Sequence, residues 1–473
     1  MLSLKTPVVA VLSLAAATGM SASLAADGDL DPGFGTGGIA YITPDLVDAQ
    51  ELQPYKAIVL PDGKVLFAGS LDAPTTVPFE QTYRGMLARF NADGTVDTSF
   101  GNSTIPGVVS VPQLVSDHRM ENIESFARLD DGSLVAVGIS QVTSAEKGFV
   151  VKMDENGVID TTFAGGTGYV LIPLYYAHAV GIDSQGRIVV AGETVDMGVY
   201  TANVMRFNAD GTPDATFGDN GTVSLAWDGA GNSGYLADLL MTEDHGVIVA
   251  GRYEVYGSGL GADFAIAKLD ATGTPDAAFG DNGLRVFHDP TDGSTSNAIL
   301  RIAATPDGGI AWAGYYYVID TGANPMILGH LGADGATDAA FGDAATPGYF
   351  RPVVEPNASS VYPSALLVQP DGKLVVSATF FAPDKEEFLA IRATAAGQFD
   401  PDFGTGGIVK IDLAPPPDGV YSESSAAALQ PDGRIILGGR AQLTQDFLVD
   451  LGVVRLLNAA APNDTIFADG FDP

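Results

Sequence analysis

Short apolar runs separated by turn signals extend along almost the whole chain. The runs 57–60, 64–69 and 86–90 are examples, and several runs are apolar at successive positions. Such continuous apolar runs are typical of strands buried on both faces between stacked sheets. Beyond residue 25, no long apolar pattern with the period of a helix occurs. The pattern therefore predicts an all-β chain.

Two kinds of tight turn separate these runs. One is Pro-Asp-Gly or a close variant, as at 61–63, and the other is Asn-Ala-Asp-Gly, as at 91–94 and 208–211. Asp-Gly between apolar runs is a strong hairpin signal, because glycine adopts the positive φ that such turns require. The first turn joins the first two strands of a unit, and the second follows the third strand. A fourth strand then follows a Phe-Gly pair, so the turns predict four antiparallel strands per unit.

This unit recurs seven times at intervals of about 62 residues, which is the signature of a repeat architecture. Each copy carries a phenylalanine, usually followed by glycine, and an aspartate three residues earlier. The phenylalanines are Phe34, Phe100, Phe163, Phe217, Phe279, Phe341 and Phe403. The aspartates are Asp31, Asp97, Asp160, Asp214, Asp276, Asp338 and Asp400.

The two ends of the repeated region belong to one unit. Residues 26–31 match the turn at 92–97, so the repeats begin at a fourth strand, and the last copy ends with the third strand, 452–457. We therefore expect the N-terminal strand, 38–43, to complete the last sheet. Repeated four-stranded sheets favour a propeller, because closing the ring leaves only short outer edges. The prediction is a seven-bladed β-propeller of four-stranded antiparallel blades, with a β-helix as the alternative.

A basic residue occupies a matched position in every third strand. These residues are Arg89, Lys152, Arg206, Lys268, His330, Arg392 and Arg455. Each precedes the aspartate of the next signature across a hairpin, where opposed side chains approach closely. The predicted pairs are Arg89 with Asp97, Arg206 with Asp214 and, across the ring closure, Arg455 with Asp31. A ring of ligand sites is the alternative, but recurrence in every blade favours an internal ion pair that orients the turn.

Three motifs together resemble the bacterial delta-60 repeat family. They are Asp-x-x-Phe-Gly-x-x-Gly, the Pro-Asp-Gly-Lys hairpin and the Arg-Phe-Asn-Ala-Asp-Gly turn, best seen at 60–69 and 89–101. The resemblance spans roughly residues 26–458 and implies a secreted bacterial propeller without an assigned reaction. The chain departs from the pattern where Ala164 replaces glycine and where Ala-Ala-Gly stands at 395–397.

The first 25 residues have the character of an export signal. Lys5 provides a basic start, residues 8–17 are apolar apart from one serine, and small residues at 23–25 suit a signal peptidase. The apolar stretch is shorter than a membrane span, which needs about 18 residues. We expect an exported protein, extracellular or periplasmic, with the propeller at 26–458 and a C-terminal tail at 459–473.

The composition limits the partners. Lys and Arg number 23 against 58 Asp and Glu, a net charge of −35, and removal of the predicted signal with its one lysine leaves −36. Such a surface repels nucleic acid and anionic lipid. No cysteine is present, so the chain carries neither disulfides nor thiolate metal sites. We expect no nucleic-acid partner, no membrane insertion and a monomer.

Motifs for chemistry are sparse. The sequence has no Asp-x-Asp-x-Asp-Gly calcium loop, no paired histidines with zinc-ligand spacing and no Gly-x-Ser-x-Gly elbow. We therefore predict no catalytic residues, no metal and no cofactor from the sequence. The connections that vary between copies are the better candidates for function, because rigid scaffolds commonly bind through loops.

The candidate binding residues are aromatic and basic: three are expected in the connection that enters the third unit, three in a connection of the fifth unit, and two form the pair at 118–119. They are Tyr175, Tyr176, His178, Tyr315, Tyr316, Tyr317, His118 and Arg119. Stacking on such rings suits an extracellular glycan or a peptide or protein partner. We predict a non-catalytic binding or scaffold module. The alternatives are a secreted polysaccharide lyase or hydrolase with a Tyr/His site at the channel mouth, and calcium-dependent adhesion. A convergent Tyr-His-Arg pocket favours the enzyme, whereas a channel lined by small residues favours the scaffold.

Overall fold

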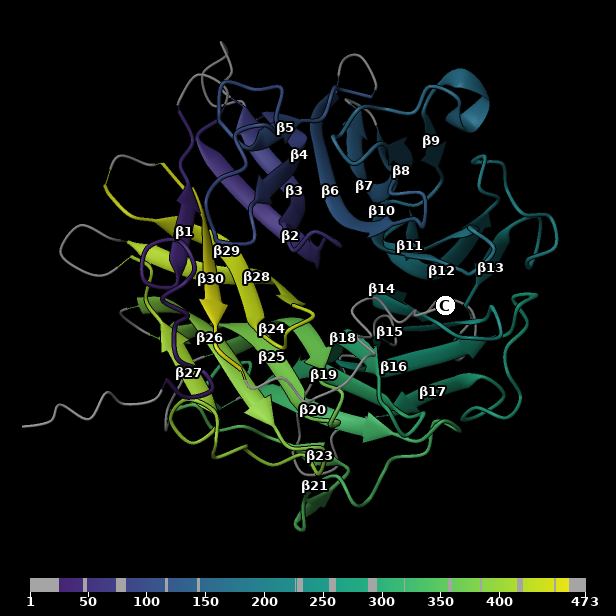
Figure 1. The fold of residues 1–473 in the computed structure, drawn as a ribbon. Coiled ribbons are helices and arrows are strands. Elements are labelled where there is room, and N and C mark those ends of the chain that lie inside the picture. The colour runs from purple at the N-terminus through teal and green to yellow at the C-terminus, as the bar shows by residue number, and fades with distance from the viewer. Residues whose placement is uncertain are drawn as a thin grey trace, which may run out of the picture.

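Seven four-stranded antiparallel sheets surround a common axis (Figure 1). The computed structural model describes residues 25–45, 49–73, 82–114, 118–142, 145–225, 227, 233–254, 261–287, 296–318, 320–355, 360–382, 385–414, 420–445 and 448–458. Within these ranges the one helical element is the short 3-10 turn η1, Phe163–Gly166. The predicted seven-bladed β-propeller is confirmed, and the β-helix alternative is wrong.

Each blade has four strands in chain order. Blade 1 contains β2 (Glu51–Val59), β3 (Val65–Ala73), β4 (Thr82–Phe90) and β5 (Val108–Ser110). Blade 2 contains β6 (His118–Arg128), β7 (Leu134–Val142), β8 (Ala145–Met153) and β9 (Tyr169–Ile172). Blade 3 contains β10 (Tyr176–Ile182), β11 (Ile188–Asp196), β12 (Val199–Phe207) and β13 (Thr222–Ser224). A parallel bridge between Tyr83 and Met120 joins blades 1 and 2 into one continuous sheet.

The remaining blades follow the same plan. Blade 4 contains β14 (Ser233–Met241), β15 (Val247–Glu254), β16 (Ala262–Leu269) and β17 (Leu284–Phe287). Blade 5 contains β18 (Asn297–Ala304), β19 (Ile310–Tyr316), β20 (Met326–Leu331) and β23 (Tyr349–Phe350), with the small hairpin β21 (Gly342–Asp343) and β22 (Thr346–Pro347) beside it. Blade 6 contains β24 (Ser360–Val368), β25 (Leu374–Ala382), β26 (Lys385–Ala393) and β27 (Ile408–Ile411).

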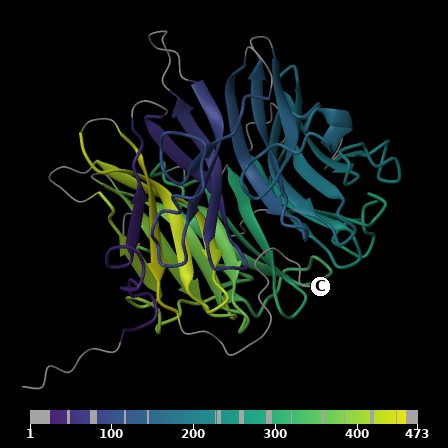
Figure 2. The ribbon, with the colours of Figure 1, turned by 45° about the horizontal axis from the view of Figure 1, so that its top comes forward.

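Blade 7 takes its strands from both ends of the chain. It contains β28 (Tyr421–Leu429), β29 (Ile435–Gln442), β30 (Asp450–Leu456) and the N-terminal β1 (Ile39–Ile42). β1 runs antiparallel to β30, with Ala40 opposite Val453 and Ile42 opposite Leu451. Figures 1 and 2 show the purple N-terminal strand beside the yellow C-terminal one. The predicted closure of the ring by the N-terminal strand is thus confirmed.

In five blades, the glycine of the turn after the third strand packs on the signature phenylalanine of the preceding blade. Gly211 has φ +85°, and a Cβ there would lie 2.7 Å from the Phe163 ring. The same arrangement recurs for Gly94 on Phe34, Gly273 on Phe217, Gly335 on Phe279 and Gly397 on Phe341. Glycine is required at this turn for two reasons: the positive φ and the space that the ring occupies. The two most regular features of the repeat are therefore two halves of one contact between blades.

The departure at Ala164 also has a structural consequence. Ala164 has φ +54°, in the left-handed region that glycine adopts without cost. Its N–H donates to the carbonyl of Asp210 at 2.8 Å, as Gly35 donates to Asp93 and Gly218 donates to Thr272. The backbone link to the next blade is therefore kept, although an alanine in this conformation costs about 1 kcal/mol.

The core lies between neighbouring blades, where strand faces pack on one another. All seven signature phenylalanines are buried in these layers. One layer, for example, joins Phe90 and Val65 of blade 1 to Ile436 and Val453 of blade 7. In the described part of the chain, the structure has no helix with the length and apolar character needed to cross a bilayer.

Candidate functional site

Every innermost strand carries a β-bulge at the same position. The first strands of the seven blades surround the axis, as Figure 1 shows, and each shifts register against the second strand of its blade. The unpaired residues at the shifts are Tyr55, Glu124, His178, Ala237, Leu300, Ser364 and Ser425. A bulge redirects a side chain and is common near functional sites.

The bulges break the symmetry of the ring. The residues that follow them are Lys56, Ser125, Ala179, Asp238, Arg301, Ala365 and Ala426. Blades 1 to 5 therefore have six ionisable side chains at these two positions: Tyr55, Lys56, Glu124, His178, Asp238 and Arg301. Blades 6 and 7 have only serine and alanine there. A repeat that serves only as a scaffold has no need for this difference, so the channel is our candidate functional site.

A cavity of about 330 Å³ lies among these residues. Its wall includes Tyr55, Glu124, His178, Glu193, Tyr235, Arg252, Arg301 and Tyr315. These side chains come from blades 1 to 5, so tyrosine, histidine, arginine and carboxylate groups from distant parts of the sequence meet in one concave site. An apolar and aromatic pocket with a few convergent polar groups is the usual form of a small-molecule site.

His178 is held by Glu193. Its Nε2 lies 3.1 Å from Glu193 Oε1, and its ring stacks on Tyr176 with centroids 5.4 Å apart. Burial by itself lowers the pKa of His178, but the hydrogen bond and the charges of Glu193 and Glu124 outweigh it and raise this pKa. Glu193 is 2% exposed, and its Oε2 has no partner among the described residues. Glu193 Oε2 can therefore accept a hydrogen bond from a ligand in the cavity.

Two further carboxyl groups, those of Glu124 and Asp238, lie half-buried around the channel. Burial raises the pKa of Glu124, and the charges of His178 and Arg301 offset this only in part. Burial likewise raises the pKa of Asp238, although its Oδ2 accepts the N–H of Ile302 and its Oδ1 that of Leu239, each at 3.0 Å. The bond to Ile302 ties blade 4 to blade 5, which indicates that Asp238 supports the channel wall.

Arg301 bridges blades 5 and 6. Its Nε donates to the carbonyl of Ser364 and its Nη1 to the carbonyl of Leu300, each at 2.6 Å. No bond from its Nη2 is found among the described residues. Two backbone acceptors therefore fix the guanidinium at the cavity wall before any ligand arrives.

A run of aromatic rings joins blades 3 and 4 at this site. Tyr175 contacts Tyr176 at 4.5 Å and Tyr200 at 6.2 Å, measured between ring centroids. Tyr200 in turn contacts Tyr235 at 4.7 Å, and Arg252 Cζ lies 4.1 Å from the Tyr235 centroid. Through Tyr176 and His178 the run continues to the cavity.

Four of the candidate residues predicted to lie in connections lie in strands instead, Tyr176 and His178 in β10 and Tyr315 and Tyr316 in β19, because these strands extend further than the apolar pattern indicates. His178 and Tyr315 line the cavity, and Tyr175 and Tyr176 belong to the adjoining aromatic run. Tyr315 also contacts Tyr362 of blade 6, with centroids 5.4 Å apart. Tyr316 instead packs on the core between blades and lies under Arg351. Tyr317 is not among the cavity residues, and the side chains of His118 and Arg119 lie outside the described residues.

Sequence reasoning missed Tyr55, Glu124, Glu193 and Arg301. No motif marks Tyr55 and Glu124, because the bulge accepts residues as different as tyrosine and serine, and none marks Glu193 or Arg301, which lie outside the bulge position. An alignment of the seven copies could have indicated the site, because the residue at the bulge is aromatic or ionisable in the first three copies and serine in the last two.

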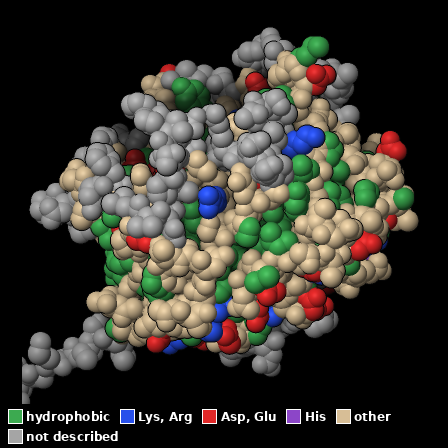
Figure 3. Space-filling view, turned by 90° about the horizontal axis from the view of Figure 1, so that it is seen from above, with side chains coloured by type: hydrophobic (Ala, Val, Ile, Leu, Met, Phe, Trp, Pro, Cys, Tyr) green, Lys and Arg blue, Asp and Glu red, His purple; other side chains and the backbone are tan. Residues whose placement is uncertain are grey.

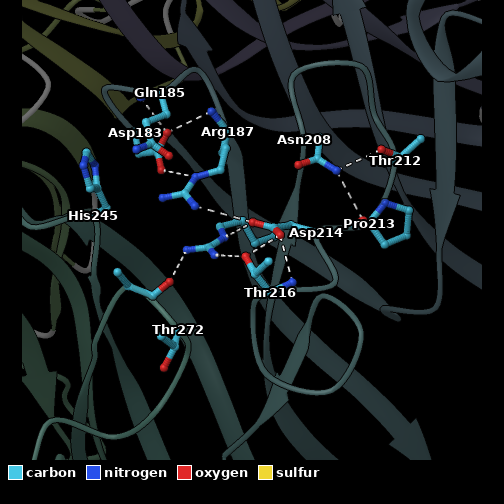
Figure 4. A network of polar contacts seen from close by, with 12 residues as sticks. Asp183, Gln185, Arg187, Asn208, Thr212, Pro213, Asp214, Thr216, His245 and Thr272 are labelled. Atoms are coloured by element: carbon cyan, nitrogen blue, oxygen red, sulfur yellow. Dashed lines mark hydrogen bonds and ion pairs between the residues drawn. The ribbon is translucent and has the colours of Figure 1, made fainter.

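The repeated basic and acidic residues lie in contact on the face that carries the Asp-Gly turns. Nε to Oδ2 distances are 2.8 Å for Arg89–Asp97, Arg206–Asp214 and Arg455–Asp31. In Figure 4, Arg187 reaches toward both Asp183 and Asp214, at 2.6 and 3.6 Å. Figure 3, turned by 90° from Figure 1, shows Asp, Glu, Lys and Arg side chains at the surface near the lower edge of the view. Within the described residues, no cluster of three or more His, Cys, Asp or Glu side chains suits a metal ion.

Comparison with known proteins supports the propeller architecture. A family described as "Domain of unknown function (DUF5122) beta-propeller" matches residues 60–100 and 184–217. No curated protein matches the sequence significantly. Both stretches cover a hairpin turn and a signature phenylalanine, in blades 1 and 3.

Several solved structures resemble the chain over most of their length, at low sequence identity. The polysaccharide lyase Uly1 has a TM-score of 0.48 and 9% identity, over 88% of this chain and 92% of that one. The propeller domain of the Trilobed protease from Pyrococcus furiosus has a TM-score of 0.44 and 9% identity, over 89% of this chain and 99% of that one. The α-L-arabinanase of Penicillium chrysogenum, complexed with arabinobiose, has a TM-score of 0.40 and 14% identity, over 70% of this chain and 92% of that one. The chain is thus a seven-bladed β-propeller protein with two segments similar to the DUF5122 β-propeller family.

Proposed function

We propose that this is an exported glycan-binding protein whose ligand enters the channel from the face that carries the variable connections. One observation carries the proposal: the aromatic run from Tyr175 to Tyr235 adjoins a cavity that is lined by charged side chains. Sugar rings have apolar faces that stack on aromatic rings and hydroxyl groups that bond to charged and polar groups. The site offers both, at adjoining positions.

The test is binding of the mature protein to a glycan array, followed by calorimetry with the best ligand. Tyr176→Ala and Tyr235→Ala should each weaken binding about tenfold, because each removes one stacking surface. Tyr317→Ala is the matched control and should bind as the wild type does. If all three variants bind equally, the proposed site is wrong.

Cleavage of the bound glycan, as by a polysaccharide lyase or hydrolase, is a second candidate function. It is favoured by the convergence of His178 on Glu193 and by the raised pKa of Glu124. A carboxyl group whose pKa is raised can protonate a leaving glycosidic oxygen, while a histidine oriented by a carboxylate can accept a proton. In hydrolysis, His178 takes the proton from a water that adds to the anomeric carbon as the bond to the leaving oxygen breaks.

Release of new chain ends from a bound polysaccharide would show this activity. Glu124→Gln and His178→Gln should then abolish release without abolishing binding, whereas Glu355→Gln, at an exposed surface position, should change neither. If the wild type binds a glycan and releases no chain ends, the protein is a binding module alone.

A further inference from the structure

The charge of the cavity differs from that of the rest of the protein. The whole chain has 23 Lys and Arg against 58 Asp and Glu. The cavity wall instead has Arg252, Arg301 and His178 against Glu124 and Glu193. Basic groups thus equal or outnumber acidic ones at this one concave site, although the chain as a whole is strongly acidic.

The negative charge of each of the two cavity carboxyl groups is opposed by a feature of its surroundings. Glu193 bonds to His178, so its charge is compensated when the imidazole is protonated. Burial favours the neutral form of Glu124. Asp238, the other acidic group near Arg301, accepts two backbone N–H groups and is not among the cavity residues. The guanidinium groups of Arg252 and Arg301 are therefore the permanent positive charges of the cavity wall.

Arg301 has the geometry of a prepared anion site. Its Nε and Nη1 are held by the carbonyls of Ser364 and Leu300, which leaves Nη2 with no bond among the described residues. A guanidinium whose orientation is already fixed loses little conformational entropy when it binds a carboxylate. Arg252 lies against the Tyr235 ring, so a cation and a stacking surface are presented side by side.

From this arrangement we infer that the preferred ligand is a glycan that carries a carboxylate. Arg301 binds the carboxylate, Arg252 adds to the positive field, and Tyr176 and Tyr235 receive the apolar faces of the sugar rings. This inference rests on the proposed glycan-binding function and specifies its ligand class. The carboxylate belongs either to a uronic acid unit within a polysaccharide or to a sialic acid at a glycan terminus.

Calorimetry with two matched pairs of sugars tests the inference and separates the two sources. The first pair is a trigalacturonate and a neutral galactose trisaccharide, and the second is sialyllactose and lactose. The carboxylated member of one pair should bind about tenfold more tightly than its neutral partner, as a hydrogen-bonded charge pair implies. The pair that shows the preference identifies the source of the carboxylate. The preference should decrease as salt is raised, because ions screen the attraction.

Arg301→Met should remove the preference and leave affinity for the neutral sugar unchanged. Arg84→Met, at an exposed position on β4, is the matched control and should keep the preference. Thermal unfolding of each variant checks the fold, and Arg252→Met provides a second test if Arg301→Met does not fold. Equal binding of carboxylated and neutral sugars would overturn the inference while the glycan-binding function stands. Binding of neither would overturn both.

Discussion

Arg455 Nε lies 2.8 Å from Asp31 Oδ2, although 424 positions separate the two residues in the sequence. The pair lies beside the β1–β30 ladder, and both side chains are buried. Arg455 also bonds to the carbonyl of Ala92 in blade 1, and Arg434 lies 3.0 Å from Asp31. One ion-pair network therefore holds the two chain ends and the neighbouring blade together.

Asp31→Asn should destabilise the protein by about 3–5 kcal/mol, because it leaves the buried Arg455 without its counter-charge. The measurement is the free energy of unfolding in urea. Asp62→Asn, at an exposed turn position that pairs with Lys64, should cost no more than about 1 kcal/mol. Equal effects of the two substitutions would show that the closure pair contributes nothing special.

Deletion of residues 26–43 should open the ring. Without β1, the backbone groups of β30 lose the ladder that Ile39 to Ile42 supply, and an unpaired strand edge promotes association between chains. We expect a lower melting temperature and concentration-dependent oligomers in size-exclusion chromatography. A monomer with the stability of the intact protein would contradict the role of the N-terminal strand.

Gly211→Ala should destabilise the protein more than Gly198→Ala. Both glycines have a positive φ, +85° and +84°, so both substitutions carry the same backbone penalty of about 1–2 kcal/mol. Only at Gly211 would the new Cβ meet the Phe163 ring, whereas nothing lies within 4 Å at Gly198. The difference in unfolding free energy measures the contact between turn and ring, and no difference would mean that the blades adjust without cost.

Stability should also depend on Glu386. Burial, the hydrogen bond to Glu423 and the charge of Glu423 raise the pKa of Glu386 to about 7, against the opposing effect of Arg440. The folded state therefore favours the protonated form, and this contribution is full below the ordinary glutamate pKa and lost as pH rises toward 7. Arg440 itself bonds to Glu423 and Glu51, so the group lies where blades 6, 7 and 1 meet.

Unfolding free energies at pH 5 and pH 8 test this dependence. The wild type should lose stability between the two values, and Glu386→Gln should lose less, because the amide has no proton to release. Glu355→Gln is the control, since Lys410 lowers the pKa of Glu355 and its carboxylate is charged at both values. An identical pH response of wild type and Glu386→Gln would contradict the assignment.

The repeat was predictable because it is encoded locally. Phe163 and Gly211 recur in register with their counterparts, and the hairpin turns between them require glycine, so blade number, strand order and ring closure follow from the sequence alone. The cavity was only partly predictable. Tyr175, Tyr176, His178 and Tyr315 stood out as aromatic or basic residues in or near variable connections. Their partners did not, because Glu193 and Arg301 reach the site through blade packing and bulge geometry, which leave no local pattern.

The ring of bulges has a consequence for how this molecule can change. Each bulge depends on the backbone register of two paired strands, and it accommodates serine, alanine, leucine, glutamate, histidine and tyrosine alike. The seven bulge positions can therefore be exchanged one at a time while the paired strands around them stay the same. A new specificity would need only a few substitutions in one column of the repeat, and the blades with serine at the bulge are the natural places to introduce it.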